Sequence, residues 1–268
     1  VYWWLMVLLG TASQVLSLHL LADVSAEVWA QIAAGAVLSM LAFGLEETGD
    51  YGRAEIYGRR GVEQEPYDGW GWHAVAYVHE MRQALREGIA WLEPASGIWS
   101  RGSFLGVHNW WHLALYHLEL DHIDEVLRLY DQAIGGPGST VVLELIDQSA
   151  LLWRLQLRGV DVGARWAALA ERWAPIAGAG NYAFNDLHAM MAFVGAGREH
   201  EQRAVLDAQR AAMAGGGDNA DFTREVGHPA VLAVQAFGAG NFGEAVRRLR
   251  PLRSYAHRFG GSHAQRDV

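Results

Sequence analysis

Two copies of one turn constrain what this chain can fold into. The segment Gly49-Asp50-Tyr51-Gly52-Arg53-Ala54 is echoed by Gly240-Asn241-Phe242-Gly243-Glu244-Ala245, and each copy joins one helix-forming stretch to the next. A turn that recurs between helices is typical of a helical-hairpin repeat. We therefore predict an all-α fold, a right-handed α-solenoid of stacked antiparallel hairpins.

A small or slender residue recurs where the two helices of each hairpin must approach closely. The intervals are about 34 to 41 residues, with one interval about twice as long that leaves room for an irregular hairpin. The positions are Ala54, Gly88, Val126, Ala204 and Ala245. This spacing predicts a single helical-repeat domain over residues 1–268, with about six hairpins in residues 34–268 and an atypical apolar segment at 1–33.

Helical stretches separated by Gly and Pro breaks give the expected hairpins. The predicted pairs are 36–47 with 53–63, 70–82 with 86–92, 103–120 with 123–134, 141–158 with 164–173, 182–195 with 199–213, and 222–237 with 242–256. The clearest breaks are Gly135-Gly136-Pro137-Gly138 and Gly215-Gly216-Gly217. Tryptophans inside these helices are expected in the core, where large rings fill the space between hairpins.

Composition excludes several classes of function. The net charge of −9 argues against a nucleic-acid partner. The absence of cysteine excludes disulfides, a thiolate nucleophile and zinc sites that use sulfur. All 21 basic residues are arginine, so a Schiff-base lysine and a P-loop lysine are excluded as well. We interpret the arginine bias as that of a GC-rich bacterial gene, and we expect a cytoplasmic protein.

Both ends of the chain raise the question of what covers them. Residues 1–22 carry no charge, so a membrane span must be considered, but polar residues interrupt the run and no basic residue flanks it. A buried first hairpin is favoured over a membrane-facing segment, and membrane contact is not expected.

The chain stops after Gly260-Gly261-Ser262-His263, where another inner helix would begin, so we expect truncation at the C-terminus. Either end could join a second copy in a homo-oligomer.

The first helix of nearly every predicted hairpin carries polar side chains, and this helix lines the concave face of a solenoid. Spacings of three or four residues place His108 with His112, and Glu225 with His228, on one helix face. Trp111 lies between His108 and His112 and is kept as a candidate contact. The full set of candidate ligand-binding residues is His73, His108, Asn109, Trp111, His112, Asn185, Asp186, His188, Arg224, Glu225, His228, His263, Gln265, Arg266 and Asp267.

Two chemistries fit this set. His108 and His112, one helical turn apart, could chelate one divalent metal ion with a third ligand from a neighbouring helix. Acid–base chemistry is the other, with His188 or His228 held by Asp186 or Glu225. The alternative to both chemistries is that these residues only satisfy one another's hydrogen bonds in a polar network. His117, His122 and His200 are expected on the surface. The segment after His79 does not fit the zincin pattern, because Gln83 stands where a second histidine is needed.

Several segments resemble the tetratricopeptide-repeat protein 38 family, over roughly residue 40 to the end. They are Leu41-Ala42-Phe43-Gly44-Leu45-Glu46-Glu47, His73-Ala74-Val75-Ala76-Tyr77-Val78-His79-Glu80-Met81, Val107-His108-Asn109-Trp110-Trp111-His112, Leu151-Leu152-Trp153-Arg154-Leu155, Ala183-Phe184-Asn185-Asp186-Leu187-His188-Ala189-Met190-Met191 and Gly260-Gly261-Ser262-His263-Ala264-Gln265-Arg266-Asp267. The resemblance implies a tetratricopeptide-like α-solenoid that continues beyond this C-terminus, and it implies no settled activity. Residues 1–32 depart from the family pattern.

We expect a tetratricopeptide-like binding module whose concave groove holds a small polar or anionic ligand or a peptide end. Arg224 and Arg266 would neutralise a carboxylate or phosphate, and Asn109 and Asn185 would read its orientation. No cofactor is expected, with one divalent metal ion as the alternative. The competing functions are a metal-assisted or His-dependent enzyme in the same groove and a structural scaffold for protein–protein interaction. The residues leave open whether the chain is an enzyme.

Overall fold

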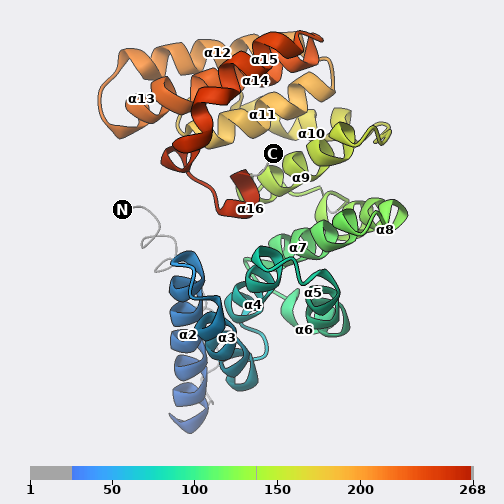
Figure 1. The fold of residues 1–268 in the computed structure, drawn as a ribbon, viewed down its shortest axis with the longest axis vertical. Coiled ribbons are helices and arrows are strands. Elements are labelled where there is room, and N and C mark those ends of the chain that lie inside the picture. The colour runs from blue at the N-terminus through green and yellow to red at the C-terminus, as the bar shows by residue number, and fades with distance from the viewer. Residues whose placement is uncertain (1–25, 137, 267–268) are drawn as a thin grey trace. The chain divides into compact units, whose positions relative to one another are not determined.

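The fold consists of helices joined by short turns (Figure 1). The structure is a computed structural model and describes residues 26–136 and 138–266. No strand occurs within these ranges. The chain divides into two compact units, the first Val1–Leu129 and the second Tyr130–Val268. Each repeat of a solenoid contacts only its neighbours, so a single solenoid can also divide into two compact units. The predicted single array therefore remains a prediction.

The first unit is built from three pairs of helices. Their bounds are α2 (Ala26–Glu47), α3 (Tyr51–Gln64), α4 (Gly69–Met81), α5 (Leu85–Leu92), the short η1 (Glu93–Ala95) and α6 (Ser96–Trp99), α7 (Gly106–Glu119) and α8 (Ile123–Leu129). Partners pack as expected, α2 with α3, α4 with α5, and α7 with α8. The first helix of each pair also contacts the first helix of the next, so α4 lies between α2 and α7.

The second unit repeats this arrangement. It contains the π-helical η2 (Tyr130–Ile134), α9 (Val142–Leu157), α10 (Arg165–Trp173), η3 (Ala174–Ile176), α11 (Ala183–Gly195), α12 (Glu199–Ala214), α13 (Asp218–Phe222), the π-helical η4 (Thr223–Gly227), α14 (His228–Gly238), α15 (Phe242–Leu249), η5 (Arg250–Ser254), η6 (Ala256–Phe259) and α16 (His263–Arg266). Here α11 contacts both α9 and α14. The six predicted helix pairs are therefore present.

The repeated turn has one geometry at both copies. Gly49 and Gly240 have positive φ angles of 83° and 74°. Each is followed by an Asx residue, and the side chains of Asp50 and Asn241 accept hydrogen bonds from amides three residues further on. A left-handed residue ends one helix and an Asx side chain caps the next. The echo in the sequence thus encodes a shared backbone conformation.

A left-handed residue ends the first helix of all six hairpins. Positive φ angles also occur at Gln83, Asp121, Gly159 and Gly197. The second helix begins two residues later in each of these hairpins except the fourth, where α10 begins six residues after Gly159. After each, the next amide bonds back to the ending helix, as in Ala84 N–H to the His79 carbonyl and His122 N–H to the His117 carbonyl. Two of these residues are not glycine, which is uncommon in the left-handed region. The repeat is therefore more regular in structure than in sequence.

Most of the predicted small contact positions are buried. Ala54, Gly88, Val126 and Ala245 are buried, whereas Ala204 is half-buried. At Gly88 an added Cβ would lie 2.6 Å from the ring of Tyr116, whose hydroxyl donates to the Ala76 carbonyl. A side chain there would push apart α5 and α7.

The first helix is longer than predicted, because α2 begins at Ala26 and not near residue 36. The added residues include alanines and only one charge, so nothing in them stops a helix. Among the described residues, one stretch, Ala30–Glu47, has the length and apolar character of a membrane span, with 28% of it buried. This is weak evidence, because core helices and signal sequences share that character. The uncharged run 1–22 lies outside the described residues.

Candidate metal centre in the first unit

Three buried histidines meet between α4 and α7. His73 comes from α4, and His108 and His112 come from successive turns of α7. One ligand nitrogen from each ring can be chosen so that all three lie within 4.8 Å of one another. The exposed fractions of the three residues are 5%, 6% and 0%. The neighbouring helix therefore brings a third histidine to the predicted pair His108 and His112, as the metal hypothesis required.

Aromatic rings surround the cluster. Trp111 stacks on His108 with a centroid distance of 5.2 Å and an interplanar angle of 15°, and it meets His112 edge-on. Tyr77 contacts both His73 and His112, and Phe43 of α2 contacts His73. Trp111 is fully buried. This tryptophan, kept as a candidate contact from the sequence, forms one wall of the cluster.

Burial sets the protonation state of His73. The pKa of this imidazole lies well below its usual value, because burial penalises the charged form and because His108 and His112 stand close by. A neutral imidazole keeps a lone pair on one nitrogen, which is the form that binds a metal. Nδ1 of His73 has no hydrogen-bond partner within the described part of the chain. Burying such an atom costs free energy unless something binds it.

A carboxylate stands behind the cluster. Oε2 of Glu80, on α4, lies 3.5 Å from Nδ1 of His112. A carboxylate on the far nitrogen of a ligating histidine is the usual outer partner in zinc sites, since it orients the ring and raises its basicity. The contact of Glu80 with α7 depends on helix packing that the sequence does not reveal.

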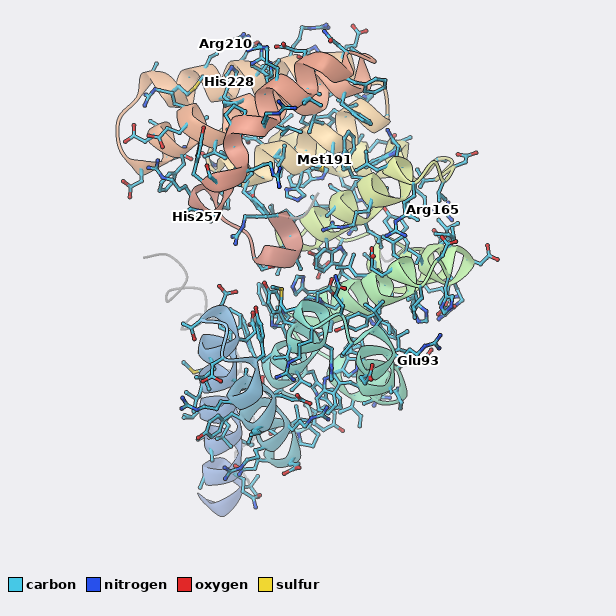
Figure 2. The ribbon with its side chains drawn as sticks, viewed as in Figure 1. Glu93, Arg165, Met191, Arg210, His228 and His257 are labelled. Atoms are coloured by element: carbon cyan, nitrogen blue, oxygen red, sulfur yellow. The ribbon has the colours of Figure 1, made fainter. Side chains whose placement is uncertain are left out.

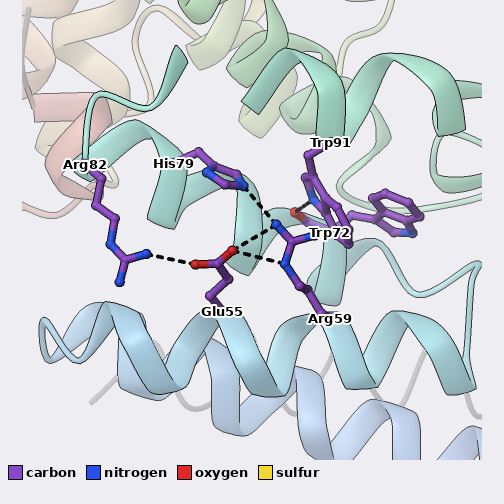
Figure 3. A network of polar contacts seen from close by, with 6 residues as sticks. All are labelled: Glu55, Arg59, Trp72, His79, Arg82 and Trp91. Carbon is purple, nitrogen blue, oxygen red and sulfur yellow. Dashed lines mark hydrogen bonds and ion pairs between the residues drawn. The ribbon is translucent and has the colours of Figure 1, made fainter. Parts of the chain in front are cut away.

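His79, the neighbour of Glu80, faces a different helix. Figure 3 shows Glu55 between Arg59 and Arg82, with Nε2 of His79 accepting from Arg59 at 3.4 Å. The Arg59 guanidinium also lies 4.6 Å from the centroid of the Trp91 ring. This network ties α3 to α4 and α5. Adjacent residues of α4 thus serve opposite neighbours, and only Glu80 belongs to the histidine cluster.

The side chain of Asn109 connects two helices. Its side chain is fully buried, and its amide donates to the Gly69 carbonyl at 3.2 Å. Gly69 is the first residue of α4, so this hydrogen bond ties α7 to the start of α4. The orientation-reading role predicted for Asn109 remains a prediction, and the observed contact is structural.

In the second unit, Asp186 and His228 are joined through a residue that the sequence analysis missed. Gln209 of α12 donates to Oδ2 of Asp186 at 3.1 Å and accepts from Nδ1 of His228 at 3.0 Å. Gln209 is fully buried, and Asp186 is nearly so. Burial raises the pKa of Asp186 to about 6, and the hydrogen bond from Gln209 partly opposes this rise. His228, labelled in Figure 2, is the first residue of α14.

The histidine–carboxylate pairs predicted for acid–base chemistry have other partners. His188 donates from Nδ1 to the Phe184 carbonyl at 2.8 Å, and burial lowers the pKa of His188 to about 4. Glu225 pairs with Arg258. The reason for the second difference is η4, a π-helical turn over Thr223–Gly227. Its wider turn shifts the phase, so residues three apart there no longer share a face as in a regular helix. Within the described ranges, the side chain of Asn185 makes no hydrogen bond or ion pair, and its backbone amide donates to the Tyr182 carbonyl.

The arginines predicted to bind an anion contact their own chain. Arg224 pairs with Asp221 and donates to the Met213 carbonyl, and Arg266 donates to the Gly260 and Gly261 carbonyls. Gln265 donates to Asp147 at 3.5 Å and exchanges capping hydrogen bonds with Ser262. The side chain of His263 and all of Asp267 lie outside the described residues.

Comparison with known proteins adds no assignment to this geometry. No protein-family model matches the sequence, and no solved structure matches the chain.

Proposed function

We propose that this chain is a tetratricopeptide-like binding module whose first unit holds one divalent transition-metal ion between His73, His108 and His112. The observation that carries the proposal is the convergence of three buried ring nitrogens within 4.8 Å of one another, from two packed helices. The tetratricopeptide part is supported by six hairpins whose first helices each end at a left-handed residue and by the resemblance described from the sequence.

The donor set favours particular ions. Imidazole nitrogen suits zinc, copper, nickel and cobalt, and no cysteine is present to favour softer ions. Ligand atoms in a tetrahedral zinc site with three histidines are roughly 3.4 Å apart, from Zn–N bonds of about 2.0–2.1 Å. The rings would close from within 4.8 Å by small side-chain rotations. Glu80 would offset part of the added charge and hold His112 in the ligating orientation.

Binding is supported better than catalysis. Three protein ligands leave one position for water or substrate, as in zinc hydrolases. However, the three histidines are at most 6% exposed, and aromatic rings form their walls. A substrate would have little access to the ion. We therefore propose that the ion joins α4 to α7 and stabilises the stack, and that a metal-assisted enzyme is the competing function.

Metal titration of chain prepared without a histidine tag tests this proposal. The chain is stripped with chelator and titrated with Zn²⁺ by calorimetry and with Co²⁺ by visible absorption, which reports tetrahedral nitrogen ligation. We expect one tight ion per chain with the Co²⁺ signature, and its loss in His73→Gln, His108→Gln and His112→Gln. Glu80→Gln should weaken binding about 10–100-fold.

His200→Gln and His228→Gln are the matched controls. His200 is exposed and His228 lies in the second unit, so both variants should bind like the parent. Circular dichroism on each variant separates lost folding from lost ligation. The proposal is wrong if the parent shows no tetrahedral Co²⁺ signature, or if the folded triad variants bind as tightly as the controls.

A further inference from the structure

We propose a second divalent-cation site in the first unit, formed by Glu93, His117 and Glu125. These residues come from the start of η1, the last turn of α7 and the first turn of α8. One ligand atom from each can be chosen so that all lie within 4.8 Å of one another. Glu93, labelled in Figure 2, is exposed, whereas Glu125 is half-buried and His117 is buried. No residue is shared with the three-histidine cluster.

His117 is the observation that separates this cluster from ordinary surface acids. It was expected on the surface, but it is only 7% exposed. That expectation was wrong because a position near the end of α7 still faces the packed side of the hairpin. Nε2 of His117 has no hydrogen-bond partner in the described ranges. Nδ1 lies 3.1 Å from Nδ1 of His122.

The contact between the two histidines bears on which nitrogen of His117 is available. Two neutral imidazoles can share one hydrogen bond only if one ring donates and the other accepts. When Nδ1 of His117 is the donor, its Nε2 carries a lone pair. A buried lone pair without a partner is costly, and a cation held with the help of nearby carboxylates would satisfy it.

The carboxylates supply charge that a cation can balance. Glu125 pairs with Arg128, with Nε of Arg128 at 2.7 Å from Oε2. A half-buried carboxylate in an ion pair with a guanidinium carries a negative charge near neutral pH. With Glu93 the cluster holds two carboxylates against one guanidinium. A divalent ion would add positive charge where a negative excess remains, and Arg128 is its natural competitor for Glu125.

The ligand set differs from that of the first site. One imidazole and two carboxylates form a harder donor set than three imidazoles, and such sets accept Mn²⁺ as well as Zn²⁺. Greater exposure and competition from Arg128 predict weaker binding here. Mn²⁺ is therefore the discriminating probe, since it should enter the mixed site in preference to the nitrogen-only site.

Paramagnetic broadening by Mn²⁺ tests the second site in the full chain. Imidazole resonances are followed by NMR while Mn²⁺ is titrated, and affinity is measured by electron paramagnetic resonance. We expect early, selective broadening of His117 and His122. Glu93→Gln and Glu125→Gln should each weaken Mn²⁺ binding about tenfold or more, and His117→Gln likewise, with the fold checked by circular dichroism.

Asp124→Asn is the matched control, because Asp124 is an exposed carboxylate next to Glu125 on α8. It should leave Mn²⁺ binding unchanged. Equal losses in Asp124→Asn and Glu125→Gln would indicate diffuse attraction to acidic surface and overturn the proposal, as would broadening that spares His117. His108→Gln must keep the Mn²⁺ site, so failure of the three-histidine centre and failure of this site are separate outcomes.

Discussion

The two units carry similar polar residues on their first helices but use them differently. In the first unit, His73, His108 and His112 converge on one another, with ring nitrogens within reach of a common ion. In the second unit, Asp186 and His228 are held by Gln209, and Arg224 is held by Asp221. A polar inner helix is therefore not by itself a ligand site. The deciding property is whether neighbouring helices bring like donors together or supply complementary partners.

The largest effect we predict comes from removing an aromatic wall in each unit. Trp111→Ala should destabilise the first unit by about 3–5 kcal/mol, the usual cost of deleting a buried tryptophan. Trp111 is fully buried and Trp153 of the second unit nearly so, which makes Trp153→Ala a matched change. Both should lower the midpoint of urea unfolding, but only Trp111→Ala should weaken Zn²⁺ binding. Equal Zn²⁺ affinity in the two variants would show that Trp111 does not support the proposed metal centre.

The pH dependence of the second unit contains two opposing contributions. Asp186 has a raised pKa of about 6, so between pH 4 and 6 its folded form holds a proton that the unfolded chain lacks, and stability falls as pH rises. His188 has a lowered pKa of about 4, so up to about pH 6.5 the unfolded chain holds the extra proton, and stability rises with pH. Over pH 4 to 6 the two contributions should nearly cancel.

Single substitutions should expose each contribution. Relative to the parent, Asp186→Asn should gain up to about 3 kcal/mol as pH rises from 4 to 6, from a shift of roughly two units at 1.36 kcal/mol each. His188→Gln should lose ground over pH 4 to 6.5 by a similar amount. Denaturant unfolding at several pH values measures both differences. Curves that stay parallel to the parent would show that these groups do not differ between folded and unfolded states.

Much of the fold followed from the sequence because turns and helix breaks are local. Gly49 and Gly240 occupy positions that need a left-handed residue, so their turns could be predicted from the sequence. Gln83 and Asp121 occupy the same conformation without being glycine, and their sequence carries no such mark. The start of α2 was missed because an alanine-rich stretch contains no stop signal. Helix existence was thus predictable, and the regularity of the repeat was only partly so.

The site was predictable only where it lay within one helix. His108 and His112 share a face of α7 by spacing alone, but their union with His73 and Glu80 depends on how α4 packs against α7. The helix face that Glu225 occupies was predicted wrongly, because no residue pattern in the sequence indicates the π-helical turn there. Gln209 was not predicted because a glutamine on the second helix of a hairpin is typical of an exposed position. In each case the missing information was the register between helices.

A smaller effect should distinguish a satisfied amide from an unsatisfied one in the second unit. Gln209→Leu should cost about 1–3 kcal/mol, because it leaves buried Asp186 without its donor. Gln148 is also fully buried, but neither amide atom has a hydrogen-bond partner within the described residues. Gln148→Leu should therefore be neutral or stabilising. Equal costs for both changes, measured by urea unfolding at pH 7, would mean that a partner of Gln148 exists outside the described contacts.

The smallest effect concerns Arg224, the residue whose role would most readily overturn the contrast between the units. Its guanidinium is exposed and paired with Asp221, so Arg224→Ala should change stability by less than about 1 kcal/mol. If the second unit has no anion site there, phosphate should shift the melting temperature of the parent and the variant equally. Arg203→Ala, another exposed ion-paired arginine of that unit, controls for general charge. A phosphate-dependent stabilisation lost only in Arg224→Ala would show that this arginine exchanges Asp221 for a ligand. The polar helices of both units would then be binding surfaces, and complementary internal partners would not exclude a site.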